Sequence, residues 1–469
     1  MKLDEFIPSE ARFAGLSEDD AGTVKKLLKV WNDRKLSNWQ RSMYYDTEQA
    51  FKDLGIALPP QLKAAKFYLG WPTQAVRKLA LRSQFDGVRL PGSDDPFELD
   101  DVIAANRFAL EFGQAVVSAY THGMALLTVF KDEAGNVQIQ GHSAESCAAI
   151  WDYRTRALSS ALTITATDDK GPSLITVWLR DKTIIAKRSD EGVWVTDVAP
   201  HRLGRVLAVP VTHDPQLRRP LGRSRITRSV MALTDMAVRA YVRMEGNAEF
   251  YSSPQIALLG MSDEAFDKLS ASDEKRFKLA MDRVIGFTKD DEGKAPELKQ
   301  LSQASMQPHS DMLRTVAMAF SGETGIPPSS LGIIHDQPAS AEAIRAAEHD
   351  LLIDATHHNR YVHSQTVRDV MGLAVMVRDG LTETPGELRR LSVRFADPEF
   401  RSLSAQADAV QKLASDMPNL SKWGVLLEQV FDDSQVERIQ ADRRMNEARS
   451  LVDQFMSGAG DVDANAQAG

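Results

Sequence analysis

The chain has 469 residues, of which 43% are hydrophobic, and its formal net charge at pH 7 is -9. This length is enough for roughly two to four domains or for one elongated subunit with a sizeable core. The acidic balance excludes a protein that binds nucleic acid over its whole surface, so any contact with DNA is expected to be local.

The single cysteine, Cys147, excludes internal disulfides and cysteine-based zinc clusters, and we expect a buried structural thiol. Neither a signal peptide nor a membrane span is expected. The start of the chain lacks a basic segment followed by an apolar one, and no run of about 18 apolar residues occurs.

The N-terminal part of the chain favours helices. Residues 9–36 place apolar side chains at helical spacing among Lys and Asp, and the aromatic-rich segment 38–57 is expected to brace this arm against the next domain. Pro59 and Pro60 break the chain before a helix over residues 64–80. A further amphipathic helix is expected over residues 100–123, ending at a glycine.

Short runs rich in β-branched residues follow, separated by Gly-Asn, Lys-Gly-Pro and Glu-Gly turn signals. They occupy residues 124–130, 136–139, 148–153, 160–166, 173–179, 183–188 and 193–195. A last strand is expected over residues 205–213, where Pro210 indicates an edge position. These runs predict an antiparallel sheet of hairpins and, with the helices before them, an α+β domain over residues 1–215.

Residues 218–244 predict a strongly basic helix. Its apolar residues recur at spacings of three and four, at Ile226, Val230, Leu233, Ala237, Tyr241 and Met244. Its basic residues include Arg223, Arg225, Arg228, Arg239 and Arg243. We expect these arginines to form a solvated basic face or ion pairs between subunits, and contact with phosphate is the alternative.

A small insert is expected after this helix. Residues 248–259 favour an extended segment, residues 263–282 a polar helix, and residues 284–298 a hairpin with a charged turn. Helical periodicity resumes at residues 311–320.

The stretch 320–348 predicts the end of one helix, a loop and the start of another. Two glycines and two prolines end the first helix, namely Gly322, Gly325, Pro327 and Pro328. Pro338 and the N-cap candidate Ser340 mark the restart. The loop between them carries Leu331, Ile333 and Ile334, which either tuck into the subunit's own core or form a contact surface.

The restarted helix is long. Residues 340–377 predict an almost uninterrupted helix, which at about 1.5 Å per residue spans about 55 Å and favours an elongated subunit. One strand is expected over residues 391–395, and residues 401–455 favour helices broken at Pro418 and near Asp432. The composition of residues 458–469 predicts a flexible tail.

Catalytic motifs are absent from the sequence. No G-x-x-x-x-G-K-S/T, G-x-S-x-G or H-E-x-x-H occurs, so neither catalytic residues nor a cofactor are expected. The best metal-site candidate is a group on the long helix: His349, Asp354, His357, His358 and His363. Chance clustering is the favoured explanation, because one helix offers two ligands and no other segment supplies the rest. A metal-dependent hydrolase using these residues remains an alternative.

Four segments and their order resemble a known family. The segments LGRSRI (221–226), AFSGETGIPPSSLG (319–332), PASAEAIRAAE (338–348) and LSVRFADPEF (391–400) lie in the same sequence of elements as in portal proteins of tailed bacteriophages of the siphophage type. The resemblance covers roughly residues 40–445.

This resemblance implies an elongated α+β subunit in a ring of about twelve copies at one capsid vertex of the virion, assembled in the host cytoplasm. Double-stranded DNA would pass through its channel without sequence specificity during packaging and ejection. The implied partners are the major capsid protein, scaffold, the large terminase subunit and a head-tail connector, with no membrane. Another structural or adaptor protein of the virion remains the alternative.

The resemblance also implies a division of the chain. The wing would be residues 1–215, the stem helix 216–245, the clip 246–307, the second stem helix 308–322, the tunnel loop 323–339, the long helix and return strand of the wing 340–400, the helical crown 401–456 and the tail 457–469.

The tunnel loop would present Ser329, Ser330, Ile333, Ile334, His335, Asp336 and Gln337 to DNA. Its tip, residues 333–337, contains no lysine or arginine. Several phosphate contacts from each of many subunits would trap DNA, whereas packaging needs passage. We therefore hypothesise a neutral or acidic channel, with the stem arginines paired to acidic groups of neighbouring subunits.

Overall fold

The computed structural model describes residues 7–50, 67–90, 95–252, 256–259, 297–300, 306–332 and 341–398, with isolated positions between 411 and 446. The chain divides into two compact units, Met1–Pro398 and Glu399–Gly469. In the second unit the isolated described positions are helical, in agreement with the predicted helices. The predicted breaks at Pro418 and Asp432 lie outside the described residues.

Helix α1 (Glu18–Tyr45) begins later and ends later than predicted. Ser17 caps it, since its hydroxyl accepts a hydrogen bond from the Asp20 amide at 3.2 Å. The residues before the cap form a 3-10 turn, η1 (Pro8–Glu10), and strand β1 (Arg12–Ala14). The aromatic-rich segment continues the helix and buries Tyr44, whereas Trp39 stays exposed.

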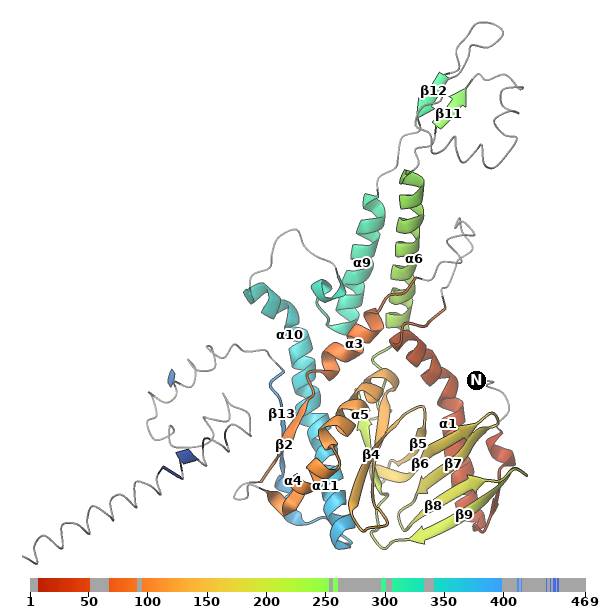
Figure 1. Ribbon diagram of the computed structural model, residues 1–469, viewed down its shortest axis with the longest axis vertical. Helices are drawn as coiled ribbons and strands as arrows, with labels where there is room; N and C mark the ends of the chain where they lie inside the picture. The colour runs from red at the N-terminus through yellow and green to blue at the C-terminus, as the bar shows by residue number, and fades with distance from the viewer. Residues whose placement is uncertain are drawn as a thin grey trace, which may run out of the picture. The chain divides into compact units, whose positions relative to one another are not determined.

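The strands form two main sheets rather than the single sheet predicted (Figure 1). The larger sheet has the order β1-β9-β8-β7-β6-β5, with β1 parallel to β9 and the other pairs antiparallel. Its remaining strands are β5 (Cys147–Asp152), β6 (Ala157–Asp168), β7 (Gly171–Trp178), β8 (Lys182–Arg188) and β9 (Val193–Pro200).

The smaller sheet has the order β10-β3-β4, built from β3 (Met124–Lys131), β4 (Val137–Ser143) and β10 (Ala208–Thr212). β10 lies at the edge of this sheet, so the edge position indicated by Pro210 is confirmed. The two sheets separate between β4 and β5 because side chains of helix α1 hydrogen-bond to backbone carbonyls of the residues that connect these strands. The side chains of Trp31 and Asn38 donate to the carbonyls of Glu145 at 2.7 Å and Ala144 at 2.9 Å.

Each sheet has its own helical cover. Helix α1 packs on the larger sheet and forms a core with Leu162, Ile175 and Trp194. Helices α5 (Phe108–His122) and α11 (Ser364–Asp379) pack against the smaller sheet in the main core (Figure 1). Helix α3 (Trp71–Ala80) packs against α5.

The helix predicted over residues 100–123 is divided into α4 (Leu99–Ala105) and α5. The break falls at Asn106, whose side-chain amide donates to the Val102 carbonyl at 2.8 Å, and at Arg107, which has φ +47°. The predicted end is confirmed, because Gly123 follows α5 with φ +116°.

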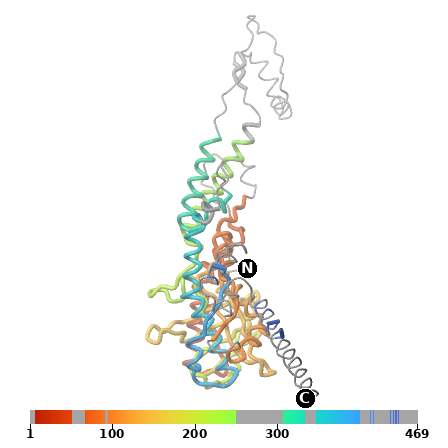
Figure 2. The backbone as a smooth tube through the Cα atoms, turned by 90° about the vertical axis from the view of Figure 1, so that its left-hand side faces the viewer, coloured from red at the N-terminus to blue at the C-terminus, as the bar shows by residue number. Residues whose placement is uncertain are grey.

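Helices α6 (Arg228–Ser252) and α9 (Gln307–Thr324) lie side by side (Figures 1 and 2). Helix α6 begins about ten residues later than the predicted helix, because Thr227 caps it with a hydroxyl that accepts from the Val230 amide at 3.2 Å. Strands β11 (Ile256–Leu259) and β12 (Glu297–Gln300) pair antiparallel between them in the chain. The polar helix predicted over 263–282, and most of the hairpin predicted over 284–298, lie outside the described residues.

The predicted long helix is present as α10 (Ala341–His357), a π-helical turn η4 (His358–His363) and α11. The predicted cap Ser340 lies outside the described residues. Strand β13 (Ser392–Phe395) confirms the predicted strand and pairs with β2 (Phe85–Arg89), which joins residues near 395 to the N-terminal domain. Within the described ranges, no helix is both long and apolar enough to cross a membrane.

Candidate functional site

The LGRSRI segment is a fixed turn ahead of α6. Gly222 has φ +82°, and a Cβ atom there would lie 2.4 Å from the Gly123 carbonyl oxygen and 2.5 Å from that of His213. The next amide, that of Arg223, donates to the His213 carbonyl at 2.8 Å. A glycine is therefore required at this position, and it sets the direction in which the following arginines leave the turn.

The five predicted arginines do not share one helical face. Arg223 and Arg225 precede α6, so their assignment to the helix is wrong. Arg228, Arg239 and Arg243 do lie on α6, and their spacing places them on one face of it. Arg228 is exposed, and Arg239 and Arg243 are half-buried.

An arginine-rich groove of about 1150 Å³ lies between α1, β5 and the turn before α6. The arginines that line it are Arg34, Arg41, Arg218, Arg219, Arg223 and Arg228, and Asp235 is the only carboxylate among the lining residues. Asp235 accepts a hydrogen bond from the Tyr44 hydroxyl at 2.8 Å. The exposed Arg223 is 3.5 Å from Asp214. The groove thus concentrates positive charge on an acidic protein.

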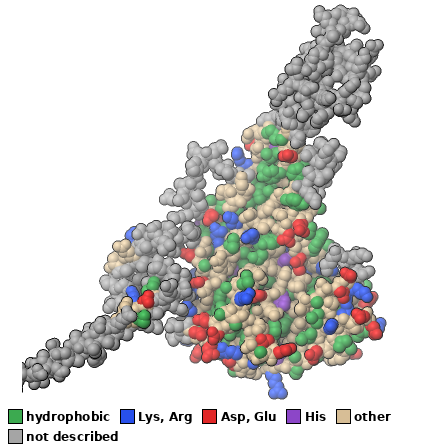
Figure 3. All heavy atoms as spheres, in the orientation of Figure 1, with side chains coloured by type: hydrophobic (Ala, Val, Ile, Leu, Met, Phe, Trp, Pro, Cys, Tyr) green, Lys and Arg blue, Asp and Glu red, His purple; other side chains and the backbone are tan. Residues whose placement is uncertain are grey.

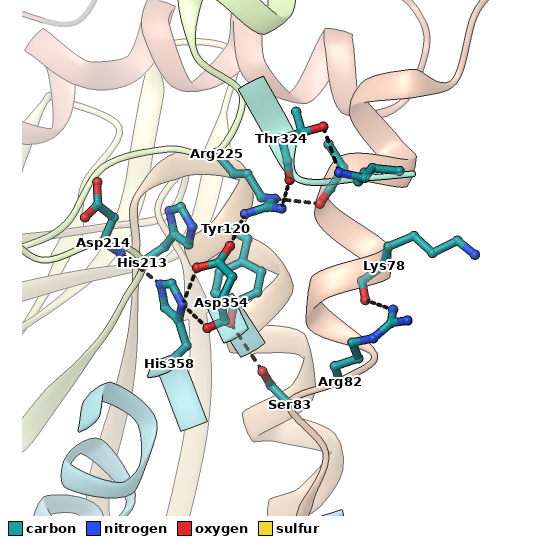
Figure 4. A network of polar contacts seen from close by, with 12 residues as sticks. Lys78, Arg82, Ser83, Tyr120, His213, Asp214, Arg225, Thr324, Asp354 and His358 are labelled. Atoms are coloured by element: carbon teal, nitrogen blue, oxygen red, sulfur yellow. Dashed lines mark hydrogen bonds and ion pairs between the residues drawn. The ribbon is translucent and has the colours of Figure 1, made fainter. Parts of the chain in front are cut away.

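Arg225 is different from the other arginines because only 8% of it is exposed. Its guanidinium donates from Nε to the Ala75 carbonyl at 2.8 Å, from Nη1 to Asp354 Oδ2 at 2.7 Å and from Nη2 to the Thr324 carbonyl at 2.5 Å. Figure 4 shows this arrangement. Arg225 therefore joins α3, α9 and α10 inside the subunit and is not available to a neighbouring copy or to DNA.

Three buried imidazoles surround Tyr120 beside this ion pair. The rings of His213 and His358 stack with centroids 4.9 Å apart and an interplanar angle of 3°. The Tyr120 hydroxyl is 2.9 Å from His363 Nε2 and 3.3 Å from the Ser83 hydroxyl. His358 and His363 reach this cluster together because the π-helical turn contains both of them.

The hydrogen bonds fix one ring nitrogen of two imidazoles as a donor. His358 Nδ1 lies 2.8 Å from the Asp354 carbonyl and 3.1 Å from Asp354 Oδ1, and both of these atoms accept. His213 Nδ1 donates to the Arg223 carbonyl at 2.7 Å. Burial and the neighbouring imidazoles lower the pKa of His213 and of His363 to about 3 each.

The Asp354 carboxylate stays charged in this cluster. Burial alone would raise its pKa, but the hydrogen bond from His358 and the charge of Arg225 hold the pKa below its ordinary value. Burial also raises the pKa of Tyr120. The cluster is thus a buried ion pair packed against aromatic side chains, of which Tyr120, His213 and His363 are uncharged at neutral pH.

The predicted metal-site residues are not brought together. His349 and His357 are exposed on α10, whereas His358 and His363 are buried beside Tyr120. Asp354 and His358 do lie one turn apart, as predicted, but Arg225 occupies the other carboxylate oxygen. In the described part of the chain, no group of three His, Cys, Asp or Glu side chains could hold a metal ion.

The loop after α9 is described as far as Gly332. Gly325 ends α9 with φ +67°, as predicted, whereas Gly322 lies inside the helix. Ser329 is exposed and Ser330 partly buried in the short turn η3 (Pro328–Leu331). The predicted tip, Ile333, Ile334, His335, Asp336 and Gln337, lies outside the described residues.

Leu331 packs into the subunit's own core, whereas Ile333 and Ile334, for which the two interpretations stay open, lie outside the described residues. It is 5% exposed in the main core, and its carbonyl accepts a hydrogen bond from Trp71 Nε1 at 3.2 Å. Trp71 also packs against Phe320 of α9, with ring centroids 5.2 Å apart. The first half of the loop is therefore attached to α3.

Sequence comparisons identify relatives over most of the chain. A family model described as phage portal protein, SPP1 Gp6-like, matches residues 18–448. The portal protein of Mycobacterium phage L5 is 28% identical over 408 residues, which cover 84% of this chain and 82% of that protein. The portal protein of Mycobacterium phage D29 is 28% identical over 407 residues, with the same coverage.

A solved structure of the neck of a native GTA particle, computed with C12 symmetry, contains a chain that aligns with a TM-score of 0.44 at 12% identity. That alignment covers 79% of this chain and 89% of the other.

The family match spans nearly the whole sequence and includes every element of the site described above. The chain therefore belongs to the phage portal protein family of the SPP1 Gp6-like type.

Proposed function

We propose that this chain assembles with copies of itself into a ring of about twelve subunits at one vertex of a bacteriophage capsid. Double-stranded DNA passes through the central channel of this ring during packaging and ejection. The observation that carries the proposal is the family match over residues 18–448. The chain supplies a conduit and a docking platform rather than an enzymatic activity, and the force for packaging comes from a separate motor.

The parts of the subunit follow from the order of its elements. We assign the stem to residues 216–245 and 308–322, which include most of α6 and α9, the clip to residues 246–307, the tunnel loop to residues 323–339 and the crown to residues 401–456. The side-by-side packing of α6 and α9 supports the stem (Figure 2). The pairing of β2 with β13 supports the return of residues 378–400 to the wing, which otherwise comprises residues 1–215.

Four of the predicted arginines, Arg223, Arg228, Arg239 and Arg243, contact neighbouring subunits rather than DNA. Arg223 and Arg228 line the arginine-rich groove, and Arg239 and Arg243 share the α6 face of Arg228. The chain carries 65 acidic and 56 basic residues, so carboxylates are available on a second copy to neutralise this charge. On the face drawn in Figure 3, basic side chains are scattered among acidic ones. Arg225 is excluded from this role by its burial.

The tunnel loop faces DNA without gripping it. Its residues Ser329, Ser330, Ile333, Ile334, His335, Asp336 and Gln337 offer neutral, apolar and acidic groups and no fixed positive charge. A surface of this kind releases no counterions from the phosphate backbone and binds it weakly at any sequence, which suits passage.

The ring has several partners in the virion and during assembly. The wing contacts the major capsid protein and scaffold, and the clip contacts first the large terminase subunit and then the head-tail connector. Assembly takes place in the host cytoplasm before the ring becomes part of the virion.

Native mass measurement and electron-microscope images of the purified chain test the proposal. The expected result is a closed ring with a central hole and one dominant subunit number. A chain that stays monomeric, or forms only open aggregates, at concentrations and salt that favour assembly would refute it and favour a monomeric adaptor.

A further inference from the structure

Arg225 touches both helices that carry the tunnel loop. Its Nη2 binds the carbonyl of Thr324, the last residue of α9, and its Nη1 binds the carboxylate of Asp354 on α10 (Figure 4). The chain between these two contact points is the loop and the first turns of α10. One side chain therefore connects the segment before the loop to the segment after it.

The geometry of this connection is rigid. A guanidinium is planar, so its three donor directions are fixed relative to one another, and here each is used by a different helix. The Thr324 carbonyl is one of the terminal carbonyls that lack a partner inside a helix, so it is free to accept from Arg225. Asp354 is held in turn by His358, which donates to its Oδ1 at 3.1 Å.

The two ends of the loop depend on Arg225 to different degrees. The α9 end has other attachments, through the Trp71–Leu331 hydrogen bond and the Trp71–Phe320 ring contact. The α10 end is tied to the region after α3 by the Arg82–Glu348 ion pair at 3.0 Å, which does not involve α9. Arg225 bridges α9 and α10 near the loop, because it donates to a group on each helix.

We propose that Arg225 and Asp354 are a positioning pair for the tunnel loop. The pair fixes the spacing between the end of α9 and α10, the two described helices that the loop connects. Breaking it broadens the distribution of that spacing and leaves the sheets and the α6–α9 packing intact. This inference rests on the proposed function for the statement that the loop faces DNA, whereas the spacing itself is a property of the folded chain.

Distance measurement between two spin labels tests the pair. Ser329, in the described first part of the loop, and His349, on α10, are both exposed, so Ser329→Cys with His349→Cys places one label near each helix. The native thiol, Cys147, is buried and has its pKa raised to about 12 by burial, so it does not compete for the reagent. The measurement uses the full chain in the background of Asp354→Asn, Asp354→Glu or the control Arg389→Gln, which changes an exposed arginine outside the groove.

The expected result is a single narrow distance in the unmodified background, in Arg389→Gln and in Asp354→Glu, which restores the carboxylate. Asp354→Asn loses this peak and gives a broad distribution, with an unchanged circular dichroism spectrum. An unchanged peak in Asp354→Asn overturns the proposal, and so does general loss of helix, which would make the pair an ordinary stability element. Ring images of the same samples report separately on the portal role, so failure of that role is seen independently of the loop.

Discussion

Replacing Arg225 by methionine should destabilise the subunit strongly. The substitution leaves the Ala75 and Thr324 carbonyls and the Asp354 carboxylate without their donor, in a position where the arginine is 8% exposed. Loss of one partner of a buried ion pair costs about 3–5 kcal/mol. Because 36% of the Asp354 side chain is exposed, water can partly solvate the carboxylate that loses its partner. We therefore expect Arg225→Met to lower the free energy of unfolding by about 3 kcal/mol.

A double-mutant cycle isolates the pair from the other contacts. Asp354→Leu should cost about 2 kcal/mol, because it strands the buried guanidinium but leaves its two carbonyl contacts. The double variant Arg225→Met with Asp354→Leu should lose about 1–2 kcal/mol less of the free energy of unfolding than the two single losses added together. Urea unfolding followed by tryptophan fluorescence measures all three. Additive losses, or a cost below about 1 kcal/mol for Arg225→Met, would refute the assignment of a coupled buried pair.

Three other predictions concern the same region. Gly222→Ala should lower the free energy of unfolding by at least about 3 kcal/mol, because its Cβ would lie 2.4 Å from the Gly123 carbonyl oxygen. The control Gly135→Ala is also at positive φ but has nothing within 4 Å, so it should lower the free energy by about 1 kcal/mol. Thermal unfolding measures both variants. The subunit should lose stability as the pH falls below about 6.5, because the folded-state pKa values of His213 and His363 are lowered to about 3 and the unfolded chain therefore binds more protons. Each of these two histidines should lower the free energy of unfolding by roughly 2 kcal/mol at about pH 5. In urea unfolding at several pH values, His363→Gln should flatten the dependence of stability on pH, whereas the same change at the exposed His349 should not. The double variant Arg219→Glu with Arg228→Glu should lower the fraction of assembled rings roughly tenfold in native mass spectra. The control double variant Arg219→Lys with Arg228→Lys keeps the positive charge and should still form rings. Equal assembly by the two double variants would contradict the intersubunit role of the groove.

Local patterns predicted most of the elements. The β-branched runs between residues 124 and 195 became strands because turn signals separate them, and the apolar stripe of residues 340–377 became the long helix. The errors fall where side chains redirect the backbone. Asn106 divides α4 from α5, and Thr227 starts α6 after the LGRSRI turn. The sequence gives only a weak signal for these capping contacts, since asparagine and threonine also occur inside helices.

The candidate site could be predicted only in part. The four-residue spacing of Asp354 and His358 indicated that they meet, and they do. Their further partners are distant in the sequence, since Arg225 is 129 positions from Asp354 and Tyr120 is 243 from His363. Arg225 also sits among exposed arginines and has no local sign of burial. Only the fold separates it from Arg223 and Arg228.

A last prediction separates stability from positioning. A buried ion pair adds little stability over well-packed apolar side chains of similar volume, so stability alone is a poor explanation for Arg225 and Asp354. Apolar side chains pack without direction, whereas the guanidinium specifies where α3, α9 and α10 lie relative to one another. The double variant Arg225→Met with Asp354→Leu should therefore lose less stability than the two single losses predict together and still give a broad distance between labels at positions 329 and 349. If the double variant gives the narrow distance, packing alone positions the loop and the directional role of the pair is wrong.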